Sequence, residues 1–163
     1  MRWRRWLIAV AGSLLVAAFV GLSAAAAWFY WDRVQTRGEE AARAVLPQLA
    51  AKEIPEVFAY DYQTVERSLT AAYPLLTPDY RQEFQKSANT QVIPEAKKRE
   101  VVVQANVVGT GIMTAKRDSA SVMVYMNRTV TDKSRQPLYD GSRLRVDFKK
   151  INRQWLIAYI TPI

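Results

Sequence analysis

One uncharged segment near the N-terminus constrains this chain more than any other feature. The 26 residues from Trp6 to Trp31 contain no charged side chain. As a helix that rises about 1.5 Å per residue, the segment would be roughly 39 Å long. A bilayer core of about 30 Å needs only about 20 residues. The segment is therefore long enough to cross a membrane.

Two interpretations of this segment are open, a signal peptide that is removed and an anchor that stays. Both share a basic start and an apolar run, and Ala25-Ala26-Ala27 would satisfy a cleavage rule for small residues. The run is longer than the roughly 7–15 apolar residues of a signal peptide, which favours the anchor. Aromatic side chains also favour it, because they gather at the headgroup level of bilayers: Trp3, Trp6, Trp28, Tyr30 and Trp31.

The charges beside the segment predict its orientation. Arg2, Arg4 and Arg5 precede it, whereas the residues that follow are mixed in charge. The excess of positive charge on cytoplasmic flanks then predicts a single-pass inner-membrane protein with a cytoplasmic N-terminus. We expect a basic tail over residues 1–5, a transmembrane helix over residues 6–31, and an extracytoplasmic, periplasmic domain over residues 32–163.

Small residues recur at every fourth position of the segment. Such a stripe lets a second transmembrane helix approach closely, which favours helix packing at these positions. The alternative is chance, because the segment is rich in alanine. The stripe consists of Ala9, Ser13, Ala17, Gly21 and Ala25.

The composition excludes several kinds of chemistry. The chain has no cysteine and no histidine, so it has no disulfides, no thiolate or imidazole metal ligands and no Ser-His-Asp triad. Its net charge is +8, but only Lys97-Lys98-Arg99 is densely basic, which argues against a nucleic-acid partner. These three residues either end a solvated helix or contact lipid headgroups or an acidic partner. We expect no cofactor, no metal and no catalytic residue.

Helical patterns occupy the first part of the expected domain. Residues 32–60 favour a helix that continues from the apolar segment, with Ala42, Val45, Leu46 and Leu49 on its apolar face. Pro47 and Pro55 predict a kink or break in it. Two further helices are expected, one capped by Asp61 and ended near Pro74, the other opened by Thr77-Pro78-Asp79 and stopped before Pro94.

The pattern then changes to that of β-strands. Residues 101–113, 120–130, 143–149 and 155–160 favour four strands, with a bulge near Gly109 and Gly111 and turns at residues 116–119 and 152–153. Strands this close in sequence predict an antiparallel meander. The fold class is α+β, with helices packed on one face of a curved sheet. Such an arrangement often encloses an apolar cavity.

Acidic residues and tyrosines form one candidate constellation. Asp61, Tyr62 and Glu66 lie close together, as do Asp79 and Glu83. Paired acids near tyrosines could perform acid–base chemistry in a pocket. The alternative is that Asp61 caps a helix, Glu66 is solvated and the tyrosines are part of the core.

The order of motifs resembles the Mce-associated membrane proteins of actinobacteria. A basic start, one span and a helix are followed by Tyr60-Asp61-Tyr62, then Leu75-Leu76-Thr77, then a Val107–Ile112 strand, and a final pair of strands over Asp140–Ile163. The resemblance covers nearly the whole chain. It departs from the family at Leu46-Pro47 and Ile54-Pro55, where prolines interrupt the helical pattern.

The resemblance implies a cone-shaped domain of the nuclear-transport-factor-two-like or cystatin-like kind. It also implies an accessory or stabilising subunit of an Mce complex that imports fatty acids or sterols. The partners would be the substrate-binding and permease subunits, together with membrane lipids. Two alternatives stay open: a tethered lipid-binding domain or small enzyme that uses an apolar cavity, and an assembly factor of a secretion system.

Overall fold

The computed structural model describes the backbone of residues 2–163 and the side chains of Trp3, Gly12 and residues 17–163. The chain forms two compact units, one up to Arg37 and one over Gly38–Ile163. The described part of the first unit is helical throughout and belongs to helix α1 (Arg2–Phe58), which ends within the second unit. The helix expected over residues 32–60 is therefore present and continues from the apolar segment.

Helix α1 is continuous through both of its prolines, so of the expected kink or break, a break is ruled out. Pro47 and Pro55 both lie inside the helix, although each removes a backbone donor. The reason is tertiary packing, because one face of this part of α1 is fully buried. Its buried side chains stabilise the helix against the two lost hydrogen bonds; they are Ala42, Leu46, Ala50 and Ile54. Val45 was expected on this face but is 49% exposed.

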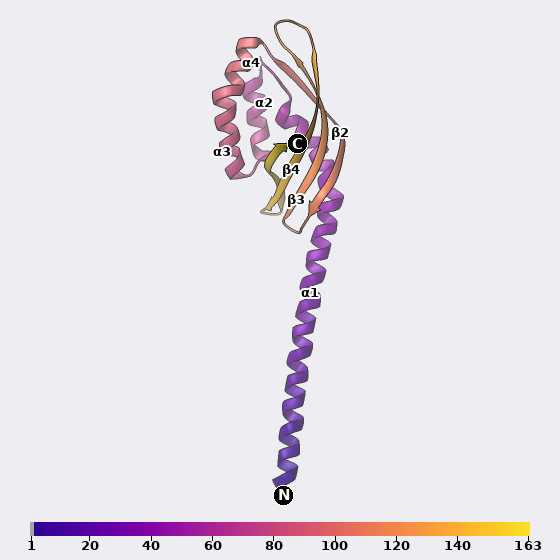
Figure 1. Ribbon diagram of the computed structural model, residues 1–163. Coiled ribbons are helices and arrows are strands. Elements are labelled where there is room, and N and C mark those ends of the chain that lie inside the picture. The colour runs from indigo at the N-terminus through magenta and orange to yellow at the C-terminus, as the bar shows by residue number, and fades with distance from the viewer. Residues whose placement is uncertain (1) are drawn as a thin grey trace. The chain divides into compact units, whose positions relative to one another are not determined.

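The helices after α1 form a layer on one side of the sheet (Figure 1). They are α2 (Val65–Ala72), the 3-10 turn η1 (Tyr73–Leu75), α3 (Pro78–Ser87), the π-helical turn η2 (Ala88–Val92) and α4 (Ile93–Arg99). Pro74 follows the end of α2 as predicted, and Thr77 is the N-cap residue of α3 with proline in the first turn.

Two details of this layer differ from the sequence prediction. Asp61 does not cap α2; its carboxylate accepts a hydrogen bond from the Gln63 backbone N–H at 2.8 Å, and Thr64 is the N-cap residue. The helical chain also does not stop before Pro94. It passes through the π-helical turn, and Pro94 lies in the first turn of α4, where a missing N–H is tolerated.

The sheet is a curled antiparallel half-barrel with strand order β1-β2-β3-β4-β5. Its strands are β1 (Tyr60–Asp61), β2 (Val102–Ala115), β3 (Ser119–Thr131), β4 (Leu138–Ile151) and β5 (Gln154–Pro162). The predicted four-strand meander is confirmed, and the two-residue strand β1 is additional. Register shifts between Val107 and Gly109 and between Ile112 and Thr114 confirm the expected bulge.

The main core lies between α1 and the concave face of the sheet. The buried residues of β3 and β4 alternate along each strand, as expected for a sheet with one covered face. Val124, Val146 and Phe148 are no more than 1% exposed and share one cluster with the buried face of α1.

Gly38 sets how closely α1 approaches the β2–β3 hairpin. A Cβ atom built on Gly38 would lie 2.7 Å from Cγ, 2.9 Å from Cβ and 3.1 Å from Cα of Arg117. The nearest atoms include backbone, so a larger residue cannot be accommodated by moving the end of a side chain alone. Only glycine fits this contact without displacing the hairpin.

We predict that Gly38→Ala destabilises the domain although alanine favours a helix. The substitution should gain about 1 kcal/mol of helix propensity and lose about 1–3 kcal/mol through overpacking. Thermal unfolding of the full chain in detergent, followed by circular dichroism, measures the difference. Gly21→Ala in the same helix is the matched control, because no atom lies within 4 Å of its Cβ position. Equal stability of the two variants would contradict the prediction.

Candidate functional site

An apolar cavity lies between the helical layer and the sheet. Its volume is about 230 Å³. We call it the helix-side cavity because most of its walls come from α1, α2, α3 and η2. Its lining residues are Val57, Phe58, Tyr60, Leu69, Phe84, Ser87, Ala88, Val92, Val103 and Arg128. Folds of the predicted kind often enclose an apolar cavity, and this one contains such a cavity.

A second cavity of about 270 Å³, the sheet-side cavity, shares two of these residues. Phe58 and Arg128 line both cavities. The other lining residues come from α3 and the last three strands: Tyr80, Met126, Ser142, Leu144, Ile160 and Pro162. Phe58, at the end of α1, and Arg128, on β3, therefore stand between the two cavities.

Strand register places an ion pair at this junction. Met126 on β3 and Leu144 on β4 are buried on the concave face, and Arg128 and Ser142 lie two residues away from them on the same face. Arg128 is directly opposite Asp140 in the β3–β4 register. Its guanidinium donates through Nε, at 3.2 Å, and through one terminal nitrogen to Oδ2 of Asp140.

The ion pair is partly open to solvent. The side chains of Arg128 and Asp140 are 33% and 40% exposed. The hydroxyl of Ser142 also donates to Asp140 Oδ2, at 3.0 Å. Hydrogen bonds from Arg128 and Ser142 lower the pKa of the Asp140 carboxyl, so it is ionised at neutral pH. The site thus combines an oriented guanidinium with apolar walls.

Two tyrosines beside the cavities are neutral at physiological pH. Burial raises the pKa of Tyr60, and the positive charge of Arg128 acts in the opposite direction. Burial raises the pKa of Tyr80 to about 12, with a smaller contribution from the charge of Glu83. The ring of Tyr80 also lies 5.3 Å from that of Tyr159, measured between centroids. These side chains are walls of the cavities rather than bases.

The acids singled out from the sequence do not form a site. Asp61, Tyr62, Glu66, Asp79 and Glu83 line neither cavity. Glu66 is exposed and pairs with Lys97 at 2.7 Å, and Asp79 and Glu83 are also exposed. Tyr62 packs against a small core cluster formed by α2, α4 and β2. The interpretation as solvated acids and core tyrosines is therefore the one that the structure favours.

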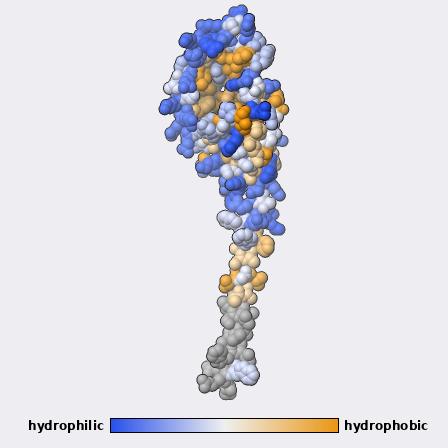
Figure 2. Space-filling model, in the orientation of Figure 1, coloured by the Kyte–Doolittle hydropathy of each residue, from blue (hydrophilic) through white to orange (hydrophobic). Residues whose placement is uncertain are grey.

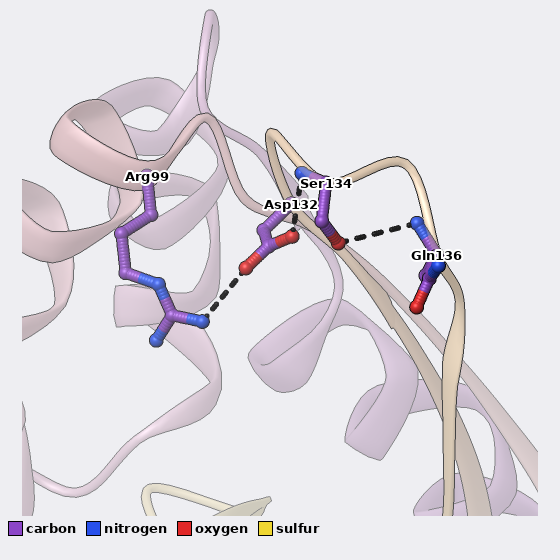
Figure 3. Close-up of polar contacts among 4 residues, drawn as sticks. All are labelled: Arg99, Asp132, Ser134 and Gln136. Carbon is purple, nitrogen blue, oxygen red and sulfur yellow. Dashed lines mark hydrogen bonds and ion pairs between the residues drawn. The ribbon is translucent and has the colours of Figure 1, made fainter.

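The basic run at the end of α4 is largely paired. Lys97 contacts Glu66, and Arg99 donates to Asp132 Oδ2 at 2.8 Å, as Figure 3 shows. Asp132 also accepts from the Ser134 backbone N–H. The hydrogen bond from Arg99 is the main reason that the pKa of Asp132 falls to about 2. These contacts fasten the β3–β4 loop to α4, which favours the helix-end interpretation of this run.

Sequence reasoning missed one unusual residue, Glu53. It lies on the buried face of α1 between Ala50 and Ile54, is 8% exposed, and its Oε2 has no hydrogen-bond partner. Burial raises its pKa to about 7, with a smaller contribution from Glu56. The sequence did indicate that Glu53 is buried, because position 53 follows Leu46 and Ala50 at helical spacing.

The apolar segment of α1 carries large exposed side chains. Trp3, Trp28, Tyr30 and Trp31 are between 63% and 79% exposed. Figure 2 shows hydrophobic colour on the stretch of the helix that follows the grey residues. In the predicted stripe of small residues, Ala17, Gly21 and Ala25 are exposed. Trp6, Ala9 and Ser13 lie outside the residues whose side chains are described.

Within the part of the chain that the structure describes, no helix is both long and apolar enough to cross a membrane.

Two mycobacterial proteins are similar to this chain in sequence. Outer membrane protein Rv1973 of Mycobacterium tuberculosis is 27% identical over 163 residues, which cover all of both chains. The uncharacterized protein Rv1362c of the same species is 25% identical over 154 residues, covering 92% of this chain and 70% of the relative. No family model matches the chain. The protein is a distant homologue of these two mycobacterial proteins.

Solved structures identify the fold of the second unit. The periplasmic domain of DotI matches 74% of this chain and 94% of its own, with a TM-score of 0.63 and 14% identity. VirB8 of Agrobacterium tumefaciens matches 68% of this chain and 84% of its own, with a TM-score of 0.56 and 12% identity.

A nuclear transport factor 2-like protein of Salmonella enterica matches 71% of this chain and 88% of its own, with a TM-score of 0.51 and 12% identity. These identities are low enough that the likenesses show the fold alone. The predicted NTF2-like fold is confirmed, and VirB8 and the periplasmic domain of DotI share it.

We predict that Glu53→Gln stabilises the protein at neutral pH but not at acid pH. The raised pKa means that the folded protein holds a proton on Glu53 more tightly than the unfolded chain does. The contribution of Glu53 to the free energy of unfolding is therefore fully present below about pH 4 and is lost as the pH rises towards 7. Glutamine cannot ionise, so the variant should be more stable by roughly 1–2 kcal/mol at pH 8.

Chemical denaturation of the full chain between pH 4 and pH 8 measures this difference. Glu40→Gln, at an exposed position of the same helix, is the control and should change little at any pH. If the free energies of unfolding of Glu53→Gln and the parent protein differ by the same amount at every pH, the pKa of Glu53 is not raised and the prediction is contradicted.

Proposed function

We propose that this protein is a non-enzymatic, membrane-anchored accessory subunit of an Mce-type lipid import complex. The observation that carries the proposal is the order of motifs along nearly the whole chain, which resembles the Mce-associated membrane proteins. The match to a mycobacterial envelope protein over the full length of both chains supports it. We expect no catalytic residue, because the acids and tyrosines that could have formed a catalytic centre are solvated or part of the core.

The anchor is the uncharged segment of residues 6–31, in the inner membrane with the N-terminus in the cytoplasm. Two features support this assignment. The described side chains of residues 17–31 are exposed and free of charge, and an exposed apolar surface of this extent requires a membrane or a protein partner. The second unit also has a fold found in periplasmic domains, as in the solved domain of DotI.

The domain acts as a structural adaptor in this proposal. The anchor packs against permease helices through Ala17, Gly21 and Ala25, where small side chains permit close approach. The second unit contacts the substrate-binding subunits of the complex and holds them in register above the membrane. The resemblance itself implies an accessory or stabilising subunit, and the adaptor role is our proposal for how such a subunit acts.

We predict opposite accessibility for the two ends of the anchor. The chain has no cysteine, so single cysteines introduced into it can be labelled without background. Ser134→Cys, in the exposed β3–β4 loop, should react with a membrane-impermeant maleimide in intact spheroplasts. Arg4→Cys should react only after the membrane is permeabilised. Labelling of both positions in intact spheroplasts would contradict a retained single-pass anchor.

We predict that the protein recovers Mce and permease subunits when it is purified from native membranes in mild detergent. Leu at both Ala17 and Gly21 should lower this recovery several-fold, because the larger side chains keep the helices apart. Leu at both Ser23 and Ala26 is the matched control, since these positions lie on the opposite side of a helix with about 3.6 residues per turn. Quantitative mass spectrometry measures the recovery.

Two results of this purification would overturn the proposal. One is the absence of Mce and permease subunits from the purified protein. The other is recovery of secretion-system subunits in their place, which would identify the protein as an assembly factor. Equal recovery by both pairs of variants would instead reject the small-residue stripe as the contact.

A further inference from the structure

The guanidinium of Arg128 is the charged group at the junction of two apolar cavities. It lines both the helix-side cavity and the sheet-side cavity, which also share Phe58. Their volumes, about 230 and 270 Å³, are somewhat below the roughly 300–1,000 Å³ of a drug-sized ligand site, which favours a slender ligand. Arg128 is 33% exposed, so its charge lies where the cavities meet solvent.

The hydrogen bonds of Arg128 use only one side of its fork. Both go to the same oxygen, Oδ2 of Asp140. A guanidinium has five N–H donors in a planar arrangement that matches a carboxylate. The remaining N–H groups take no part in these two bonds and can donate to a second anion. Asp140 and Ser142 then fix the direction in which the fork points.

The ion pair is poorly explained as a stabilising feature. Partly exposed pairs typically contribute about 0–1 kcal/mol to the free energy of unfolding. Along the same face of β3, the preceding inward positions are the buried apolar residues Val122, Val124 and Met126. A charge at the next inward position interrupts an apolar surface and gains little stability in return. A role in binding accounts for it more economically.

We propose that the helix-side cavity, with Arg128 at its edge, is a site for a free fatty acid. The acyl chain lies against the apolar walls of this cavity, and Arg128 binds the carboxylate where the cavity meets solvent. A single chain suits a cavity of about 230 Å³, whereas the two chains of a phospholipid would exceed it. The proposal rests on this cavity and on Arg128, and does not depend on which complex the protein joins.

Photoaffinity labelling of the full chain in lipid nanodiscs tests this site. A fatty acid with a diazirine in its chain is compared with its methyl ester, which has the same chain but no charge. Labelled peptides are mapped by mass spectrometry, and labelling of residues 17–31 serves as an internal reference. We expect the acid to label the peptides that contain Phe58 and Phe84, and the ester to label them about tenfold less.

Substitutions at the ion pair should act in opposite directions. Arg128→Gln should reduce labelling by the acid to the level of the ester. Asp140→Asn should raise labelling by the acid several-fold, because Arg128 then lacks a competing carboxylate. A pair that only supports the fold predicts the same direction for both variants. Arg143→Gln is the control, since this exposed arginine of β4 lines neither cavity.

Three outcomes would overturn the proposal. They are labelling confined to residues outside the helix-side cavity, equal labelling of this cavity by acid and ester in the parent protein, and a fall in labelling by the acid in Asp140→Asn. If Arg128→Gln does not fold, the comparison of acid with ester and the Asp140→Asn variant still decide. Failure here would leave the purification of Mce partners unaffected, so the two proposals are tested separately.

Discussion

The burial of one face of α1 against the curled sheet is the interaction on which the rest of the domain depends. Leu46, Ala50 and Ile54 are fully buried in one cluster with the inward side chains of β3 and β4. This contact keeps α1 helical through two prolines and places the end of the helix at Phe58, between the two cavities. The close approach at Gly38 permits the same packing at the other end of the contact.

Strand register then determines what the cavities can bind. Successive side chains of a strand point to opposite faces, so the inward set of β3 includes Arg128 along with Val122, Val124 and Met126. The antiparallel register places Asp140 directly opposite Arg128. A shift of one residue would move this ion pair to the outer face and leave the cavities without a charged group. Register therefore converts an apolar core into a candidate site.

Much of the fold could be predicted because its signals are local. The strand periods, the glycines at the bulges, the turn at Asn152-Arg153 and the start of α3 at Thr77-Pro78-Asp79 are each determined by residues close in sequence. No break occurs at Pro47 or Pro55, since tertiary packing outweighs helix propensity there. The predicted stop before Pro94 is wrong, because a π-helical turn continues the helical chain into α4. Strand β1 was not predicted because its two residues are too few to show the alternating pattern of a strand.

The candidate site was less predictable, because it depends on contacts between distant residues. The fold class favoured an apolar cavity, but the sequence drew attention to Asp61 and Glu66, which cluster in sequence and line neither cavity. Arg128 and Asp140 are twelve positions apart and meet only through the β3–β4 register. Glu53 differs from both cases, since its helical spacing already placed a carboxyl on a buried face. An ionisable group on an otherwise apolar face is thus a better guide to this fold than a cluster of acids in sequence.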